Sequence, residues 1–290
     1  MEKIGFIGLG IMGKPMAHNL KKAGYDVAVY TRRPESAESL IEAGAIFYAS
    51  PQALAPRVDV IIVMVQGTAD VEEILKSRKG IIHTAKPHTI VIDMSTISAT
   101  ATQRMANLLE KKQIEMLDAP VSGGEQGAIA GSLTIMVGGK AETLNKVQPI
   151  FEVLGKQITH IGDHGAGQVA KACNQIIIAQ TIVAVSEALC LAKASGVDPA
   201  KVREALSSGF ASSRILEVHG KRMLEKDYNP GFKASLHRKD MHLAIEHAHQ
   251  VGIEIPGANY AMLCLDRLVS KGHSEKDSSA VHLLAEEKVR

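Results

Sequence analysis

Three polar side chains near the middle of the chain, Lys171, Asn174 and Gln175, have the types and spacing to act on one substrate. They lie three and four positions apart, so in a helix they share one face. A lysine on a mostly apolar helix is costly to bury without a partner, and its ammonium group can give a proton to a substrate oxygen. Alternatively, Lys171 extends its charged end into solvent, as most lysines on such helices do. The rest of the chain must decide between these two interpretations.

A glycine pattern near the N-terminus indicates a dinucleotide site. Residues 4–13 have the pattern of a strand, then G-x-G-x-x-G, then the start of a helix. Gly8 permits the tight turn, Gly10 lets the backbone approach a pyrophosphate, and Gly13 lets the helix pack closely on the strand. The pyrophosphate would lie at the helix N-terminus, where unpaired N–H groups and the helix dipole favour an anion. A glycine-rich turn without a ligand is the alternative, and the strand–loop–helix context disfavours it.

The end of the second predicted strand bears on which nucleotide is bound. About twenty residues after the glycines, an NAD site usually has an acid that holds the ribose 2′-hydroxyl. This chain has Thr31, Arg32 and Arg33 there, and a guanidinium suits a 2′-phosphate through charge-assisted contacts. The two arginines could instead form a solvated loop pair. We expect NADPH/NADP as the cofactor, with NAD as the alternative.

The elements that must position these residues follow from the apolar periodicity. Short strand-like runs alternate with helical patterns in the first half, which predicts a mostly parallel sheet covered by helices. The predicted strands cover residues 4–7, 26–30, 58–65, 89–94, 115–119 and 133–137. Only helical patterns follow residue 162, at 166–195, 199–207, 215–226, 235–250, 256–271 and 279–287.

The predicted fold class is therefore an α/β Rossmann-type dinucleotide-binding domain followed by an all-α domain. We place the first domain at residues 1–163 and the second at 164–290, joined by the long helix that bears Lys171. A helix of this length exposes more apolar surface than one small domain covers, so we expect a homodimer or a homotetramer.

Composition disfavours several other classes of protein. The small formal net charge of +2 gives no reason to expect a nucleic-acid partner or an anionic membrane surface. Polar residues interrupt the apolar run after Lys171, so we expect no membrane span. Three separated cysteines, expected to be buried, and an N-terminus that starts at once with a strand pattern indicate a cytoplasmic protein. No metal site is expected from the histidines that scatter around one predicted helix, His242, His247 and His249.

With these residues in view, the chain resembles the β-hydroxyacid dehydrogenase family along nearly its whole length. Residues 5–16 match the family's opening signature, and residues 118–124, Asp-Ala-Pro-Val-Ser-Gly-Gly, look like its substrate-binding motif. Residues 165–175 are similar to its catalytic-lysine motif, and Lys239-Asp240 to its late cofactor-contacting pair. Residues 64–67, Met-Val-Gln-Gly, depart from the family's usual Met-Leu-Pro, which puts the shape of one cofactor-side loop in doubt.

The resemblance implies a role for each matching position. Lys171 would be the general acid/base that exchanges a proton with the substrate oxygen. The substrate would be held at its carboxylate by a turn of small residues and oriented by two amides: Ser122, Gly123, Gly124, Asn174 and Gln175. The cofactor would be contacted by the glycine loop and by later segments: Gly8, Leu9, Gly10, Ile11, Met12, Gly13, Thr31, Arg32, Arg33, Met64, Val65, Ser95, Thr96 and Lys239.

The implied activity is NADP(H)-dependent interconversion of a small 3-hydroxy acid and its semialdehyde, without a metal. Residues 123–125 and 236–240 look most like those of 2-hydroxy-3-oxopropionate (tartronate semialdehyde) reductases. Activity as a 3-hydroxyisobutyrate dehydrogenase or a glyoxylate/succinic semialdehyde reductase remains open. An imine reductase or a non-enzymatic scaffold is disfavoured, because such relatives lack the lysine that stands here at position 171.

Overall fold

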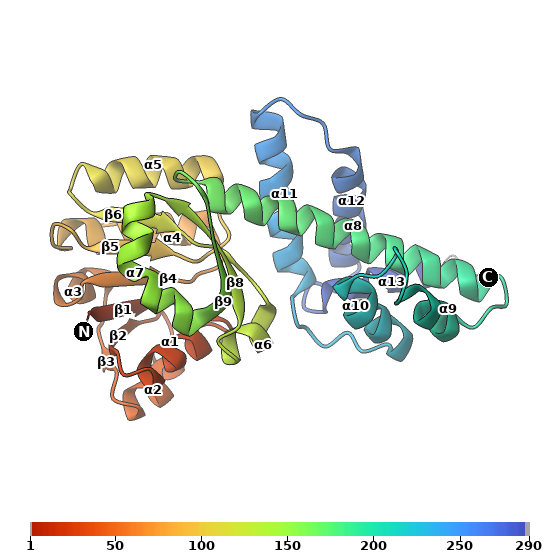
Figure 1. Cartoon of the computed structure of the whole chain (residues 1–290), viewed down its shortest axis with the longest axis horizontal. Coiled ribbons are helices and arrows are strands. Elements are labelled where there is room, and N and C mark those ends of the chain that lie inside the picture. The colour runs from red at the N-terminus through yellow and green to blue at the C-terminus, as the bar shows by residue number, and fades with distance from the viewer. Residues whose placement is uncertain (1, 288–290) are drawn as a thin grey trace. The chain divides into compact units, whose positions relative to one another are not determined.

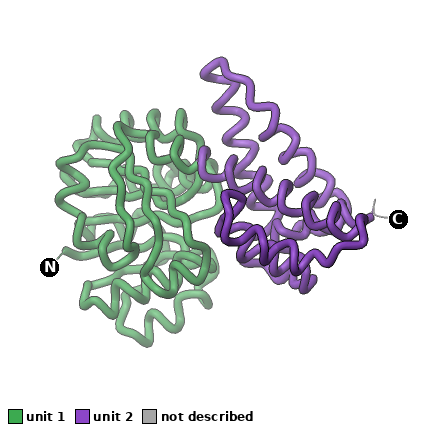
Figure 2. The backbone as a smooth tube through the Cα atoms, turned by 45° about the vertical axis from the view of Figure 1, so that its right-hand side comes forward, with its two compact units in different colours: residues 1–171 green, residues 172–290 purple. Residues whose placement is uncertain are grey.

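The computed structural model describes residues 2–287 and divides the chain into two compact units. The first comprises residues 1–171 and the second residues 172–290, coloured green and purple in Figure 2. The division falls inside a continuous helix, α8 (Ala166–Ala194). The first turns of that helix pack on the sheet of the first unit, where a Cβ at Gly167 would lie 2.4 Å from the carbonyl oxygen of Met136.

A mixed nine-stranded sheet forms the centre of the first unit (Figure 1). Its order is β3-β2-β1-β4-β5-β6-β8-β7, with β9 pairing with β8 off this path. All pairs from β3 to β6 are parallel, and β8 runs antiparallel to β6 and β7. The strands are β1 (Lys3–Ile7), β2 (Asp26–Tyr30), β3 (Ile46–Phe47), β4 (Val60–Val63), β5 (Ile90–Asp93), β6 (Glu115–Asp118), β7 (Val121–Ser122), β8 (Leu133–Gly139) and β9 (Gly155–Gly162).

Alternating side chains of the central strands build a core on each face of the sheet. In β4, Val60 and Ile62 enter one core while Ile61 and Val63 enter the other, as the two-residue period of a strand requires. One face is covered by α1 (Gly13–Lys22), α2 (Glu38–Glu42), α6 (Gly124–Ile129) and α7 (Ala141–Leu154). The other is covered by α3 (Pro51–Leu54), α4 (Thr68–Lys76) and α5 (Ala99–Glu110).

Three strands lie outside the predicted set, namely β3, β7 and β9. Strands β3 and β7 have two residues each, too few for a periodic pattern. Among the described strands, β9 pairs with β8 alone and is largely exposed, so its polar sequence carries no apolar alternation. The expected fold class, a Rossmann-type sheet followed by an all-helical domain, is confirmed.

The described residues of the second unit form helices joined by loops, with an isolated β-bridge between Lys233 and Asp277. It contains most of α8 (Ala166–Ala194), followed by α9 (Pro199–Leu206), α10 (Arg214–Glu225), α11 (Ala234–Gln250), α12 (Pro256–Ser270) and α13 (Val281–Glu286). Local signals start two of these helices: Asp198 accepts a hydrogen bond from the amide of Ala200, and Ser213 from that of Leu216. Their apolar faces meet in one core with α8.

Among the described residues, α8 is the one helix long and apolar enough to cross a membrane by length and composition. Its most apolar window has a mean hydropathy of 1.8, and half of that window is buried inside the protein. Such burial is the behaviour of a core helix.

A buried carboxylate, Asp277, ties the end of the second unit together. It accepts hydrogen bonds from the amides of Gly231, Phe232 and Ser279, and it pairs with Arg222 at 3.0 Å. Burial opposes its charge, but the hydrogen bonds outweigh burial and hold the pKa of Asp277 well below its ordinary value. The folded state is thus stabilised by the ionised carboxylate.

We expect Asp277→Asn to lower the free energy of unfolding by about 3 kcal/mol, because it removes one partner of a buried, hydrogen-bonded ion pair. A carboxyl with a depressed folded-state pKa stabilises the protein above its unfolded-state pKa, about 3.9, and loses that effect as the pH falls further. The difference between wild type and variant in urea unfolding should therefore shrink below about pH 4. Glu217→Gln, which breaks an exposed pair with Arg214, is the matched control, with little effect expected. Equal effects of the two substitutions would contradict the assignment.

Candidate active site

The glycine loop between β1 and α1 has the geometry of a pyrophosphate cradle. Gly8 has a φ of +100°, its amide donates to the carbonyl of Tyr30 at 3.0 Å, and a Cβ there would lie 2.2 Å from the carbonyl oxygen of Met64. A Cβ at Gly13 would lie 2.0 Å from the carbonyl oxygen of Gly8. At Gly10, in contrast, a Cβ would meet nothing within 4 Å. The first and third glycines thus serve the protein's own packing, whereas the second leaves open space where a ligand can approach, so the loop fits a dinucleotide.

A cleft of about 720 Å³ adjoins this loop, within the first unit. Of the residues predicted to contact the cofactor, it is lined by Gly8, Leu9, Gly10, Thr31, Arg32, Arg33, Met64 and Val65. Ile11, which is 54 % exposed, Met12 and Gly13 follow in the same loop and helix but are outside this lining.

The cleft also contains charged residues that the sequence did not single out. Asp70 and Glu73 come from α4, and Arg78 and Lys79 from the segment that follows it. The carboxylate of Asp70 pairs with the guanidinium of Arg32 at 3.0 Å. No local motif marks these residues, because their place in the cleft depends on the pairing of β4 beside β1.

At the carboxyl end of β5, Ser95 and Gln168 connect three segments of the first unit. The Ser95 hydroxyl accepts a hydrogen bond from the amide of Val65 at 2.9 Å, and Ser95 itself is fully buried. The Gln168 side chain donates to the carbonyl of Ser95 at 2.8 Å and accepts from the amide of Ile97 at 3.0 Å. Thr96, between these partners, is partly exposed. The strand end predicted to face the nicotinamide is thereby fixed to the first turn of α8.

The start of α8 is held by a carboxylate from β6. Asp118, which is fully buried, accepts hydrogen bonds from the amides of Gly165 at 2.8 Å and Gln168 at 3.0 Å. These amides are among those that a helix leaves without an internal partner at its N-terminus, where the dipole also favours negative charge. Burial raises the pKa of Asp118, and the two amide hydrogen bonds act against that rise.

Lys171 lies one turn after Gln168 on α8 and is only 8 % exposed. It shares a buried stripe with Gln168 and Gln175, as their spacing of three and four residues requires. The alternative in which this lysine extends freely into solvent does not describe the structure.

Farther along α8, two predicted substrate residues form a chain of hydrogen bonds in the second unit. The amide of Asn174 donates to the side-chain oxygen of Gln175 at 2.9 Å, and Gln175 donates to Asp240 at 2.5 Å. Asp240, buried to 3 % exposure, pairs with Lys239 at 2.9 Å. Gln175 is therefore engaged by protein groups, and Asn174 is the more accessible of the two.

The turn after β7 is built from backbone conformations that favour glycine. Gly123 has a φ of +135° and Gly124 a φ of +61°, directly after the partly exposed Ser122. Without side chains, these two positions leave the neighbouring amides uncovered, as the expected anion-binding turn needs.

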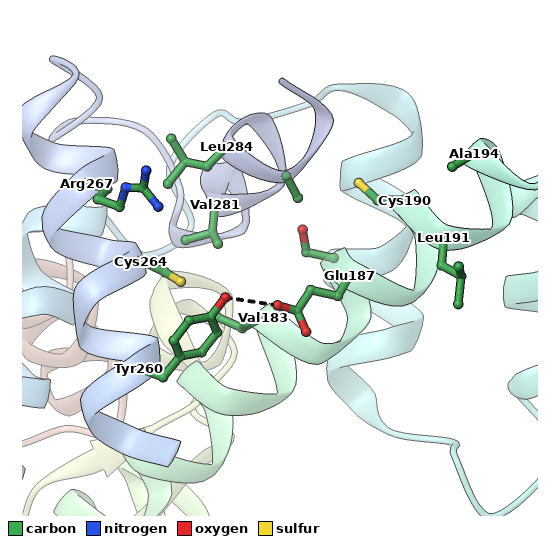
Figure 3. Close-up of a pocket in the computed structure, with 12 residues that line it drawn as sticks. Val183, Glu187, Cys190, Leu191, Ala194, Tyr260, Cys264, Arg267, Val281 and Leu284 are labelled. Atoms are coloured by element: carbon green, nitrogen blue, oxygen red, sulfur yellow. Dashed lines mark hydrogen bonds between the residues drawn. The ribbon is translucent and has the colours of Figure 1, made fainter. Parts of the chain in front are cut away.

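The second unit has a cavity of its own, of about 300 Å³, between α8, α12 and α13 (Figure 3). None of the predicted site residues lines it. The hydrogen bond drawn in Figure 3 at this cavity runs from the Tyr260 hydroxyl to Glu187 at 3.2 Å.

The cysteines differ in exposure. Cys190 is buried beside the cavity of the second unit, whereas Cys173 is exposed, so the expectation that all the cysteines are buried was wrong. Residues 2–287 contain no cluster of side chains suited to a metal ion.

We expect Gly10→Ala to weaken dinucleotide binding about tenfold or more without lowering the thermal unfolding midpoint. The added methyl meets no protein atom but fills the space left for the ligand. The loop therefore loses contacts to the charged pyrophosphate. Gly13→Ala is the structural comparison and should lower the midpoint itself, because its methyl meets the backbone of Gly8. Fluorescence titration with the reduced nucleotide and thermal unfolding separate the two effects. Unchanged affinity in Gly10→Ala would contradict the cradle.

Comparisons with known proteins agree with this geometry. Residues 3–162 match the family described as the NAD-binding domain of 6-phosphogluconate dehydrogenase. Residues 165–284 match the NAD-binding family of NADP-dependent 3-hydroxyisobutyrate dehydrogenase.

Individual relatives span nearly the whole chain. It is 45 % identical to 2-hydroxy-3-oxopropionate reductase of Escherichia coli (strain K12), over 96 % of this chain and 95 % of that protein. It is 37 % identical to an NAD-dependent L-serine dehydrogenase of Pseudomonas aeruginosa, over 98 % of both. A solved structure of Mycobacterium tuberculosis 3-hydroxyisobutyrate dehydrogenase with L-serine superposes with a TM-score of 0.90 at 33 % identity, over 98 % of this chain and 99 % of that one. The chain therefore belongs to the 3-hydroxyisobutyrate dehydrogenase family of NAD(P)-dependent β-hydroxyacid dehydrogenases.

Proposed function

We propose that this enzyme reduces a small 3-oxo acid to the 3-hydroxy acid with NADPH, and that 2-hydroxy-3-oxopropionate is its substrate. The observation that carries the proposal is the placement of Lys171, buried on α8 one turn beyond the contacts of Asp118 and Gln168. The 45 % identity to a 2-hydroxy-3-oxopropionate reductase supports the choice of substrate.

Lys171 is assigned the proton transfer. When bound, the nicotinamide supplies the hydride in reduction and accepts it in oxidation. The Lys171 ammonium donates a proton from Nζ to the aldehyde oxygen, and the neutral amine takes it back from the hydroxyl in the reverse direction. Because the start of α8 is fixed at Asp118, the position of this nitrogen relative to the β5 end is preorganised.

The other predicted residues bind and orient. Ser122, Gly123 and Gly124 hold the substrate carboxylate through a hydroxyl and uncovered amides. Asn174 aligns the substrate, while Gln175 keeps Asn174 in place through its own bond to Asp240. Ser95, Thr96 and Lys239 are assigned to the cofactor.

A second substrate, 3-hydroxyisobutyrate, is favoured by a separate observation, the match of residues 165–284 to the 3-hydroxyisobutyrate dehydrogenase family. Glyoxylate, succinic semialdehyde and 2-hydroxy-3-oxopropionate each carry a carboxylate and an aldehyde, and 3-hydroxyisobutyrate carries a carboxylate and the hydroxyl that oxidation converts to an aldehyde. Because the chemistry is common to all four, side-chain size at the pocket wall decides among them. Values of kcat/KM over this panel with both nucleotides identify the substrate.

We also propose that the protein is cytoplasmic and forms a homodimer or homotetramer. Large apolar side chains are exposed on α8 and α12, among them Leu191 at 69 % and Leu263 at 58 %. Leu191 and Tyr260 border the cavity of the second unit (Figure 3). Burial of this surface against a second copy removes apolar area from water.

For proton transfer, Lys171→Ala should lower kcat by about 10²–10⁴, the usual contribution of a general acid/base. NADPH affinity should change little, because the contacts to pyrophosphate and ribose lie elsewhere. Asn174→Ala should mainly raise KM for the acid substrate. Steady-state kinetics and nucleotide titration measure all three quantities, and near-normal turnover in Lys171→Ala would refute the mechanism.

For the cofactor, Arg32→Ala should lower the ratio of kcat/KM for NADPH to that for NADH about tenfold or more, because a charge-assisted contact to the 2′-phosphate is lost. A wild-type enzyme that prefers NADH, or an unchanged ratio in the variant, would contradict this assignment.

For assembly, light scattering at micromolar concentration should report a dimer or tetramer, and Leu191→Glu should shift it toward the monomer. Val251→Glu, which changes an exposed apolar residue outside α8 and α12, is the control. A monomeric wild type would overturn the proposal.

A further inference from the structure

The ion pair between Arg32 and Asp70 joins two separate segments of the first unit at the cofactor cleft. Arg32 follows β2, and Asp70 lies in the first turn of α4. Their closest atoms, Nη2 and Oδ1, are 3.0 Å apart, and both residues line the cleft. The arginine side chain is 67 % exposed, whereas the aspartate is 24 % exposed, so Asp70 is the better fixed of the two.

The charged residues around this ion pair affect how Arg32 can bind a 2′-phosphate. The cleft is lined by four cations, Arg32, Arg33, Arg78 and Lys79, and by two acids, Asp70 and Glu73. Of the four cations, Arg32 is the one that an acid of the cleft holds in an ion pair. A 2′-phosphate bound by Arg32 must share the guanidinium with the Asp70 carboxylate, and two anions on one cation repel each other.

The Asp70 carboxylate can accept a hydrogen bond from the ribose of a nucleotide that lacks the 2′-phosphate. The end of β2 lacks the acid that holds a ribose 2′-hydroxyl in NAD sites, since Thr31 stands there. Asp70 brings a carboxylate to Arg32 from a different element. A hydroxyl can donate a hydrogen bond to this carboxylate, and a phosphate cannot.

We propose that Asp70 tunes the nucleotide preference of this enzyme: its negative charge beside Arg32 limits how far NADPH is preferred over NADH. The proposal rests on the proposed role of Arg32. It makes Asp70, which lies outside the glycine loop and the residues after β2, a specificity-determining residue.

The direct test is Asp70→Asn, which keeps the size of the side chain and removes its charge. We expect the ratio of kcat/KM for NADPH to that for NADH to rise about three- to tenfold, the range for one nearby charge at a partly exposed site. Binding of adenosine 2′,5′-bisphosphate relative to 5′-AMP, measured by calorimetry, should shift in the same direction. These fragments report on the ribose end alone, so the proton-transfer chemistry does not enter.

Glu73→Gln is the matched control, because it removes one negative charge from the same cleft and the same helix. It should change either ratio less than about twofold. In the Arg32→Ala background, Asp70→Asn should raise the ratio less than it does in wild type, because the guanidinium no longer holds the 2′-phosphate beside the carboxylate. Thermal unfolding confirms that each variant is folded.

The outcomes distinguish the proposed role of Arg32 from the proposed role of Asp70. If Arg32→Ala leaves the preference unchanged, Arg32 does not bind the 2′-phosphate and both proposals fall. If Arg32→Ala lowers the preference while Asp70→Asn matches wild type, only the role of Asp70 is overturned. It is also overturned if Glu73→Gln has the same effect as Asp70→Asn, since the cause would then be the total charge of the cleft.

Discussion

The site of the first unit depends on a single buried carboxylate. Asp118 ends β6 and accepts two amide hydrogen bonds from the start of α8, so it joins the sheet to the helix that bears Lys171. Gln168, one of the amide donors, uses its side chain to bind Ser95 and Ile97 after β5. Two strand ends and one helix end are thus fixed in one network. This network holds the part of α8 that bears Lys171 in place, as the role in proton transfer proposed for that lysine requires.

The sequence predicts most reliably what local structure determines. The turn at Gly8, the helix at Gly13 and the arginines after β2 all lie within the first thirty-three residues, in one strand–loop–helix–strand unit. Residue type and helical spacing marked Lys171 as a candidate, and the family resemblance gave it a role and added the turn at Gly123. Asp70, Arg78 and Lys79 were not predicted as cleft residues, because they come to line the cleft through the pairing of β4 beside β1. The same limit explains β9, whose polar residues are stabilised by pairing with β8 rather than by their own periodicity.

Asp118 and Asp277 show two different uses of a buried acid. Both are fully buried and both accept backbone amide hydrogen bonds, but Asp277 also has Arg222 beside it. Hydrogen bonds from the side chains of His219 and Ser279 and from backbone amides outweigh burial and lower the pKa of Asp277, whereas burial dominates at Asp118 and raises its pKa. The arrangement at Asp277 stabilises the helical unit. The arrangement at Asp118 fixes the start of α8 relative to the sheet.

The division of the chain at Lys171 has a consequence for how such an enzyme can diversify. The lysine is the last residue of the first unit, so it belongs to the same compact body as the glycine loop and the nucleotide cleft. The residues that follow it on α8 belong to the other body. Substitutions in the helical unit, which contains Asn174 and Gln175, can therefore alter how a substrate is oriented, while Lys171, the proposed proton donor, keeps its place relative to the nucleotide-binding strands. In evolutionary terms, the proposed proton donor and the proposed carboxylate-binding turn at Gly123 are inherited with one module, and the proposed orienting amides of α8 with the other.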